Sequence, residues 1–322
     1  MERVFNFSKE PFEEGHKTPK SKAVHFLSRQ APISQILPTL SYQHVSIFGT
    51  KKDRTQVGFL LDGIRDIPPE SGQLIFKNMV FMPGDAFLRA SPFHIDRWGR
   101  DLFYTLFGLK NPQPMRYQID MLTRRNYRYP QIPSVQFFGS DREYFFDDET
   151  TALLVFARMN LALQGDNLTP SEKIEWQERV NWLFRSDHFE NGAYVTPKGK
   201  ERSWLDTFVF PKPDVVTYTH GIVTAAIILA DKLGLEVPKE DLRQVQEVYR
   251  RLIHPSGRLQ LSRNIPYKDT SSLVGEHLVN RALNENILPS QIVTETVETL
   301  DRGGRGFANV SKENGLPLNP LE

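Results

Sequence analysis

The sequence predicts a mainly α fold, in which helical hairpins form an α/α toroid behind a small N-terminal β-rich segment. After Pro83-Gly84 the apolar residues recur with the 3.6-residue period of amphipathic helices. These helices come in pairs, a more apolar one followed by a more polar one. Before residue 85 the apolar runs are short and strand-like. We therefore expect residues 1–85 to form an arm and a β-rich segment, and residues 86–322 to form a toroid-like domain.

The β-rich segment is predicted between Tyr42 and about Met82. The apolar runs there are SIFGT, QVGFLLDGI and QLIFKNMVFM, separated by KKDR and PPESG. β-branched and aromatic runs between such polar, Pro- and Gly-containing clusters are typical of strands joined by turns. Residues 1–24 are charged and polar, which indicates a poorly ordered arm or strap.

The helices follow in order, and Thr169-Pro170 supplies a helix start in the usual N-cap and N1 order. A helix that is apolar all round, as in 219–233, must be covered on every side. Stacked inner and outer helices satisfy this need, and the absence of a visible internal repeat favours a toroid over a solenoid. The long loop 186–217 indicates a working face. The predicted helices are 101–110, 115–125, 148–164, 170–185, 219–233, 239–253, 271–284 and 290–300.

Composition narrows the function classes. The 322 residues include 40 Lys+Arg, 39 Asp+Glu and no Cys. A net charge of +1 gives no case for nucleic-acid binding or for docking on an anionic membrane. Without cysteine, and with histidines that lack metal-ligand spacing, neither a metal nor another cofactor is expected. No apolar leader or membrane-length run is seen, so we expect a cytoplasmic protein. The sequence does not indicate an oligomeric state.

The first candidate site lies where HIDRWGRD runs into an apolar helix. Arg97, Trp98, Arg100 and Asp101 form a dense group of charges around an indole ring, which is costly unless the charges are paired or face a cleft. A carboxylate at a helix start is also ordinary capping, with Arg97 or Arg100 as its ion-pair partner.

Tyr144 and the acids Asp147, Asp148 and Glu149 form a second candidate site at the start of helix 148–164. Such carboxylates can bind sugar hydroxyls or a cation, or they can simply complement the helix dipole.

The third candidate site is the long loop, where Trp204, Asp206 and His220 place aromatic faces beside an acid and an imidazole. Aromatic surfaces with a few polar groups suit sugar rings, although such a loop can equally cover the helical core. Glu276, in SSLVGEHL, is a further acid that also fits a helix-capping pattern.

The stretch RWGRDLFYTLFGL resembles the W-G-R-D signature of the glucosidase domain of glycogen-debranching enzymes and related six-hairpin glycosidases. SWLDTF, followed by an apolar helix, is similar to that family's T-W-M-D-A loop, and YFFDDETTALLVFARM is similar to the start of one of its inner helices. The resemblance implies an (α/α)6 toroid. It also implies hydrolysis of α-linked glucosides by a general acid and a carboxylate that activates water.

Carried over residue by residue, the resemblance makes Asp101 a general acid or substrate-holding acid. Trp98 and Arg100 would line the sugar pocket, while Trp204 and Asp206 would hold sugar hydroxyls. The family's twelve helices and its late N-G-G-type segment, which carries the second catalytic carboxylate, are not matched. Either the toroid is truncated at the C-terminus, or another acid such as Glu276 takes that role, or the fold survives without catalysis.

The leading hypothesis is therefore a metal-independent glycoside hydrolase with a carbohydrate substrate, and enzymatic activity itself is left open. One alternative is a non-catalytic carbohydrate-binding or protein-interaction module on the same scaffold. Another is a polysaccharide lyase or epimerase, in which Tyr218 or His220 would act as the base.

Overall fold

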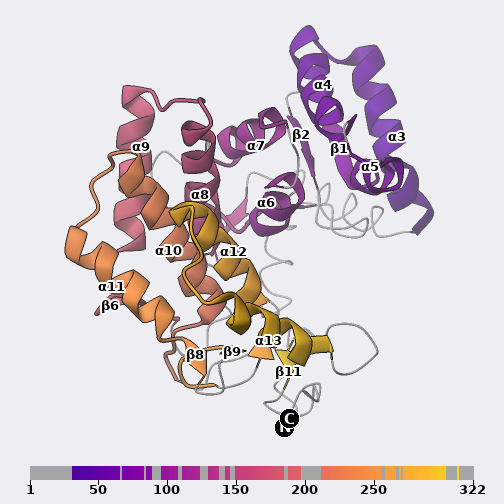
Figure 1. Cartoon of the computed structure of the whole chain (residues 1–322). Coiled ribbons are helices and arrows are strands. Elements are labelled where there is room, and N and C mark those ends of the chain that lie inside the picture. The colour runs from indigo at the N-terminus through magenta and orange to yellow at the C-terminus, as the bar shows by residue number, and fades with distance from the viewer. Residues whose placement is uncertain are drawn as a thin grey trace. The chain divides into compact units, whose positions relative to one another are not determined.

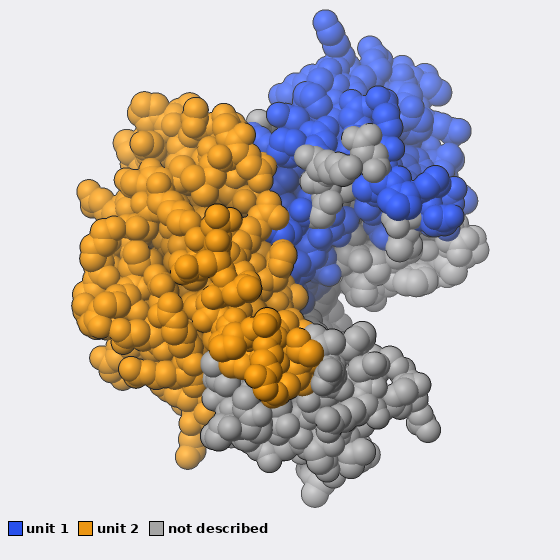
Figure 2. Space-filling model, viewed as in Figure 1, with its two compact units in different colours: residues 1–146 blue, residues 147–322 orange. Residues whose placement is uncertain are grey.

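The computed structural model divides into two compact units, residues 1–146 and 147–322 (Figure 2). The division lies well after the boundary predicted at 85/86, so the WGRD segment belongs to the first unit. The structure describes residues 31–65, 67–82, 85–88, 96–107, 111–123, 130–137, 142–145, 149–184, 188–196, 212–254, 258–265, 268–269, 271–301 and 310–311.

The described part of the chain is mainly helical, as predicted, with a few small sheets. None of the described helices is long and apolar enough to cross a membrane. The helices that the structure describes in unit 1 are α3 (Ala31–Phe48), α4 (Lys51–Arg65), α5 (Pro69–Phe76), α6 (Gly99–Phe107) and α7 (Gln113–Thr123). Its strands are β1 (Met79–Met82) with β2 (Asp85–Leu88), and β3 (Arg97–Trp98) with β4 (Val135–Gln136) and β5 (Glu143–Tyr144), all antiparallel.

The predicted strands between residues 42 and 82 are wrong except for β1. Thr50 and Asp53 cap α4, because the Asp53 carboxylate accepts hydrogen bonds from the Thr50 amide (2.7 Å) and hydroxyl (2.8 Å). The KKDR run is therefore a first helical turn and not a loop. Pro69 begins α5, where a proline costs no hydrogen bond. Val57 and Leu60, three residues apart, then bury one face of α4.

Unit 2 contains three successive helical hairpins, and the six helices predicted for this region are confirmed (Figure 1). The helices are α8 (Glu149–Leu163), α9 (Pro170–Leu183), α10 (Thr217–Lys232), α11 (Lys239–Arg250), α12 (Ser271–Leu283) and α13 (Ser290–Asp301). Two short two-stranded ladders lie between the hairpins: β6 (Phe189–Glu190) with β7 (Ala193–Tyr194), and β8 (Ile253–His254) with β9 (Arg258–Leu259). A third joins β10 (Lys268–Asp269), before α12, to β11 (Val310–Ser311), after α13.

The first helices of the three hairpins, α8, α10 and α12, run parallel and pack together. At their N-terminal ends the Thr219 hydroxyl donates to Glu149 Oε1 (3.1 Å), joining α10 to α8. Near the same end of α10 and α12, a Cβ on Gly221 would lie 2.9 Å from the Cα of Gly275, so the two helices touch backbone to backbone. At the opposite end Lys232 Nζ of α10 donates to the Ala282 carbonyl of α12 (2.6 Å). These contacts build an inner layer of three helices.

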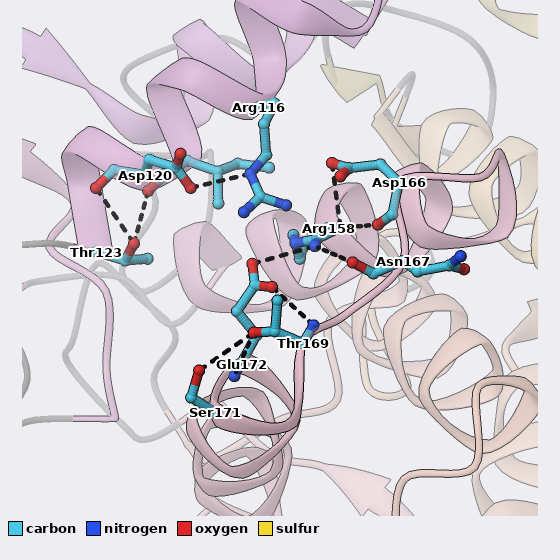
Figure 3. A network of polar contacts seen from close by, with 10 residues as sticks. Arg116, Asp120, Thr123, Arg158, Asp166, Asn167, Thr169, Ser171 and Glu172 are labelled. Carbon is cyan, nitrogen blue, oxygen red and sulfur yellow. Dashed lines mark hydrogen bonds and ion pairs between the residues drawn. The ribbon is translucent and has the colours of Figure 1, made fainter.

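A buried arginine, Arg158, joins the two helices of the α8–α9 hairpin, as Figure 3 shows. The predicted N-cap is confirmed, because Thr169 and Glu172 form a capping box at the start of α9. Arg158 of α8 is only 1% exposed and binds Glu172 Oε1 (3.1 Å) and the Asp166 carbonyl (2.8 Å). The same carboxylate thus caps α9 and holds α8 against it.

Candidate functional site

A three-stranded sheet in unit 1 brings together aromatic residues that are far apart in the sequence. Trp98 pairs with Val135, and Val135 pairs with Tyr144. Residues directly opposite one another across a ladder share one face, so Trp98 and Tyr144 lie on the same side of the sheet. Trp98 is partly exposed and Tyr144 is 36% exposed. The sheet therefore carries two part-exposed aromatic side chains on one face, one on each side of the buried Val135, here called the Trp98–Tyr144 face.

The other face of the same sheet holds a chain of polar side chains. Arg97 Nη1 donates to Gln136 Oε1 (2.6 Å), and Gln136 Nε2 donates to Glu143 Oε1 (2.7 Å). Arg97 is 4% exposed. The predicted substrate-binding role of Arg97 is therefore not favoured, since its guanidinium serves to join the three strands on the side away from Trp98.

Helix α6 begins directly after the Trp98–Tyr144 face. The Gly99 amide donates to the Ser134 carbonyl (3.0 Å), which fixes the first turn of α6 against the start of β4. Arg100 and Asp101 lie in that first turn and are both partly exposed. Here the helix dipole favours a carboxylate such as Asp101. The sheet and α6 thus place a guanidinium and a carboxylate immediately after the indole in the chain.

His220, a predicted substrate-binding residue, lies sealed inside unit 2. Its Nδ1 accepts a hydrogen bond from the Tyr194 amide (3.2 Å), and Nε2 lies 3.0 Å from the Val245 carbonyl, to which it donates. Burial lowers the pKa of His220 to about 4, and the positive charge of Arg263 adds to this effect. A neutral ring with both nitrogens occupied by main-chain groups fits a structural histidine, which joins α10 to β7 and α11.

Glu276, the predicted second catalytic acid, is also buried, with 2% exposure. Tyr249 of α11 donates its hydroxyl to Glu276 Oε2 (3.0 Å), and the Tyr249 ring stacks on His220 at a centroid distance of 6.3 Å. Burial raises the pKa of the Glu276 carboxyl, while the hydrogen bond from Tyr249 opposes that rise. A substrate has no access to this carboxyl in the structure, so the geometry favours a role in packing α12 against α11 over the predicted catalytic role.

Glu149 is the one member of the predicted acidic group 147–149 that the structure describes. It begins α8, is fully buried, and accepts the Thr219 hydroxyl. This carboxylate serves the contact between α8 and α10. Asp147 and Asp148 lie outside the described residues, as do Trp204 and Asp206, so their predicted roles stay predictions.

The predicted site residues fall into both units: Asp101 and Trp98 lie in unit 1, while His220 and Glu276 lie in unit 2. Sequence reasoning missed Gln136 and Glu143, which connect the strands. The alternation in β5, where Glu143 and Tyr144 face opposite sides, is the signal that could have pointed to Glu143.

A comparison with known proteins found no protein-family model that matches the chain and no curated protein with significant similarity.

Proposed function

We propose that this chain is a carbohydrate-active protein of the glycoside hydrolase type, acting on α-linked glucosides or related oligosaccharides at the Trp98–Tyr144 face. The observation that carries the proposal is an accessible pair of aromatic residues on one face of a sheet, followed in the chain by Arg100 and Asp101. Two strands apart, the paired backbones are separated by about 10 Å. Aromatic surfaces at such a spacing suit sugar rings, whose hydroxyls need charged and polar partners.

In this proposal Asp101 protonates the leaving oxygen or holds a sugar hydroxyl, and Arg100 binds neighbouring hydroxyls. An inverting reaction needs a second carboxylate about 6.5–9.5 Å away to activate water. Glu276 is sealed, and Asp206, the other predicted catalytic acid, lies outside the described residues. The three hairpins of unit 2, with their parallel inner helices, support the proposed α/α-toroid layout.

The test is release of sugar from a panel of α-linked gluco-oligosaccharides, detected by chromatography. Asp101→Asn should abolish product formation and leave the chain folded, because asparagine keeps the size and shape of this partly exposed side chain. Asp120→Asn is the matched control: Asp120 lies in α7 of the same unit and pairs with Arg116 at 3.1 Å (Figure 3). Full activity of Asp101→Asn would overturn its assignment.

A non-catalytic carbohydrate-binding module is the second candidate. The sealing of Glu276 favours it, since it removes the nearest alternative for a second catalytic acid. For a binding module, the same gluco-oligosaccharides should raise the melting temperature of the chain without releasing any product. Trp98→Ala should abolish that rise. If the panel gives neither product nor a rise, both candidates are wrong. The lyase or epimerase alternative loses support, because Tyr218 is 1% exposed and His220 is fully buried.

A further inference from the structure

Helix α3 has one face that packs into unit 1. Val45 is fully buried, and Pro38, seven residues earlier, is buried on the same face. The Ser41 hydroxyl accepts a hydrogen bond from the Phe81 amide of β1 (3.3 Å). These contacts fix which way α3 faces, so its opposite side is turned away from the β1–β2 hairpin.

That opposite side carries a row of exposed aliphatic residues, here called the α3 stripe: Ile36, Leu40 and Ile47. Spacings of four and seven residues place them on one helix face. Val45 follows Ile36 by two and a half turns, which puts the stripe opposite the buried face. The exposed fractions are 49% for Ile36, 52% for Leu40 and 68% for Ile47.

The whole of α3 is uncharged: APISQILPTLSYQHVSIF contains no Asp, Glu, Lys or Arg. Exposed helix faces of monomeric proteins ordinarily carry charges. Helix α11 of unit 2 shows the ordinary case, because Arg243 pairs with Glu240 (2.6 Å) and Glu247 (2.8 Å) on its exposed face. Between Ile36 and Ile47 this exposed face is uncharged, and Gln43 is the polar side chain among its aliphatic residues; such a face suits contact with another largely apolar surface.

We propose that the α3 stripe binds the α3 stripe of a second copy of this chain, with the two helices antiparallel about a two-fold axis. In such an interface the same surface is used by both copies, and any charge near the axis meets its like. Because α3 carries no Asp, Glu, Lys or Arg, two copies of the helix can meet at the axis without placing like charges together. The antiparallel arrangement sets Ile36 of one copy against Ile47 of the other and places both Leu40 side chains near the centre.

The positions of the basic residues closest to α3 in the sequence favour a second copy of the chain over a lipid surface as the binding partner. Lys51 and Lys52 follow the end of α3 and lie beyond the stripe. A helix that lies on an anionic membrane carries basic residues along its polar face, and α3 carries none. The two ends of the stripe, Ile36 and Ile47, are 11 residues apart, about 16 Å along the helix. Such a contact is smaller than a standard interface, so the dimer is concentration-dependent and not obligate.

The test is sedimentation of the full chain over a range of micromolar concentrations. The mass should rise from the single-chain value of 37.1 kDa toward twice that value. Leu40→Glu places two carboxylates at the centre of the contact and should hold the chain at 37.1 kDa at every concentration. Ser46→Glu is the matched control, because it adds the same charge at an exposed position of α3 about 100° away from Ile47. It should leave the dimer intact.

The proposal is overturned if the unaltered chain stays at one mass, or if both variants weaken association equally. It is also overturned if the chain remains monomeric and instead sediments with phosphatidylcholine–phosphatidylserine vesicles in a manner that Leu40→Glu abolishes. Circular dichroism confirms that each variant is folded. The test does not depend on the proposed function, because it needs no carbohydrate and alters no residue of the Trp98–Tyr144 face.

Discussion

The polar groups of unit 2 and those around the Trp98–Tyr144 face of unit 1 are held in different ways. In unit 2, Arg158, His220 and Glu276 are exposed by 1%, 0% and 2%, and each binds partners within the unit. In unit 1, Arg100 and Asp101 are partly exposed at the start of α6. A buried group with filled hydrogen bonds stabilises the fold, whereas a ligand can reach a half-exposed one. Residue type alone does not separate these two roles.

The largest expected difference between the two units comes from removing one arginine from each, Arg158 and Arg116, both drawn in Figure 3. Arg158→Ala should lower the free energy of unfolding by about 3–5 kcal/mol, because it empties a buried site and takes the cation from Glu172 and Asp166. Arg116→Ala should cost less than about 1 kcal/mol, because its pair with Asp120 is partly exposed. Urea unfolding measures both, and equal losses would contradict the contrast between the units.

The next largest effect is the pH dependence that His220 imposes. Its folded-state pKa of about 4 lies below the unfolded value of 6.5, so the unfolded chain takes up the proton first as the pH falls. Stability from this group is complete above pH 6.5 and is lost between pH 6.5 and 4, by about 3 kcal/mol in all.

His220→Gln should flatten that part of the stability curve, because glutamine does not titrate there. His277→Gln, a substitution at an exposed position of α12 in the same unit, is the control. Urea unfolding between pH 4 and 8 measures the slopes. An unchanged slope in His220→Gln would show that the ring is not sealed as described.

A smaller effect is expected from the tight helix crossing. Gly221→Ala should destabilise the chain by about 1–3 kcal/mol, because the new Cβ would lie 2.9 Å from Gly275 Cα and 3.0 Å from Tyr249 Cε2. Gly58→Ala in α4 of unit 1 has no atom within 4 Å of its new Cβ, so helix propensity should make it neutral or stabilising. Thermal unfolding of the two variants measures the difference. A neutral Gly221→Ala would mean that α10 and α12 do not touch at this point.

The sequence predicted the hairpins of unit 2 well because the signals there are local. Thr169-Pro170 marks a helix start, and the apolar pattern of 219–233 demands burial on every side. It failed between residues 42 and 82 because Lys51–Arg54 and Pro68-Pro69 were interpreted as turns, although both begin helices. The start of α4 depends on the hydrogen bonds between Thr50 and Asp53, and the neighbouring apolar runs, which are typical of strands, gave no sign of this cap.

The candidate site was harder to predict, since its parts meet only through tertiary pairing. Trp98 and Tyr144 share a face because both strands pair with β4, and Val135-Gln136 carries no chemical motif. Likewise nothing near Glu276 in the sequence shows that Tyr249 of α11 closes over it. The residue types were found from the sequence, but their accessibility was not.

The most direct test of the account compares Asp101→Asn with Glu276→Gln in sugar release and melting temperature at pH 7. Asp101→Asn should be inactive and remain folded, with a melting transition as cooperative as that of the unaltered chain. Glu276→Gln should stay active and be at least as stable, because burial penalises the charged carboxylate as the pH rises above 4.5 toward its raised pKa, and the amide escapes that cost. An active Asp101→Asn together with a folded but inactive Glu276→Gln would contradict the account.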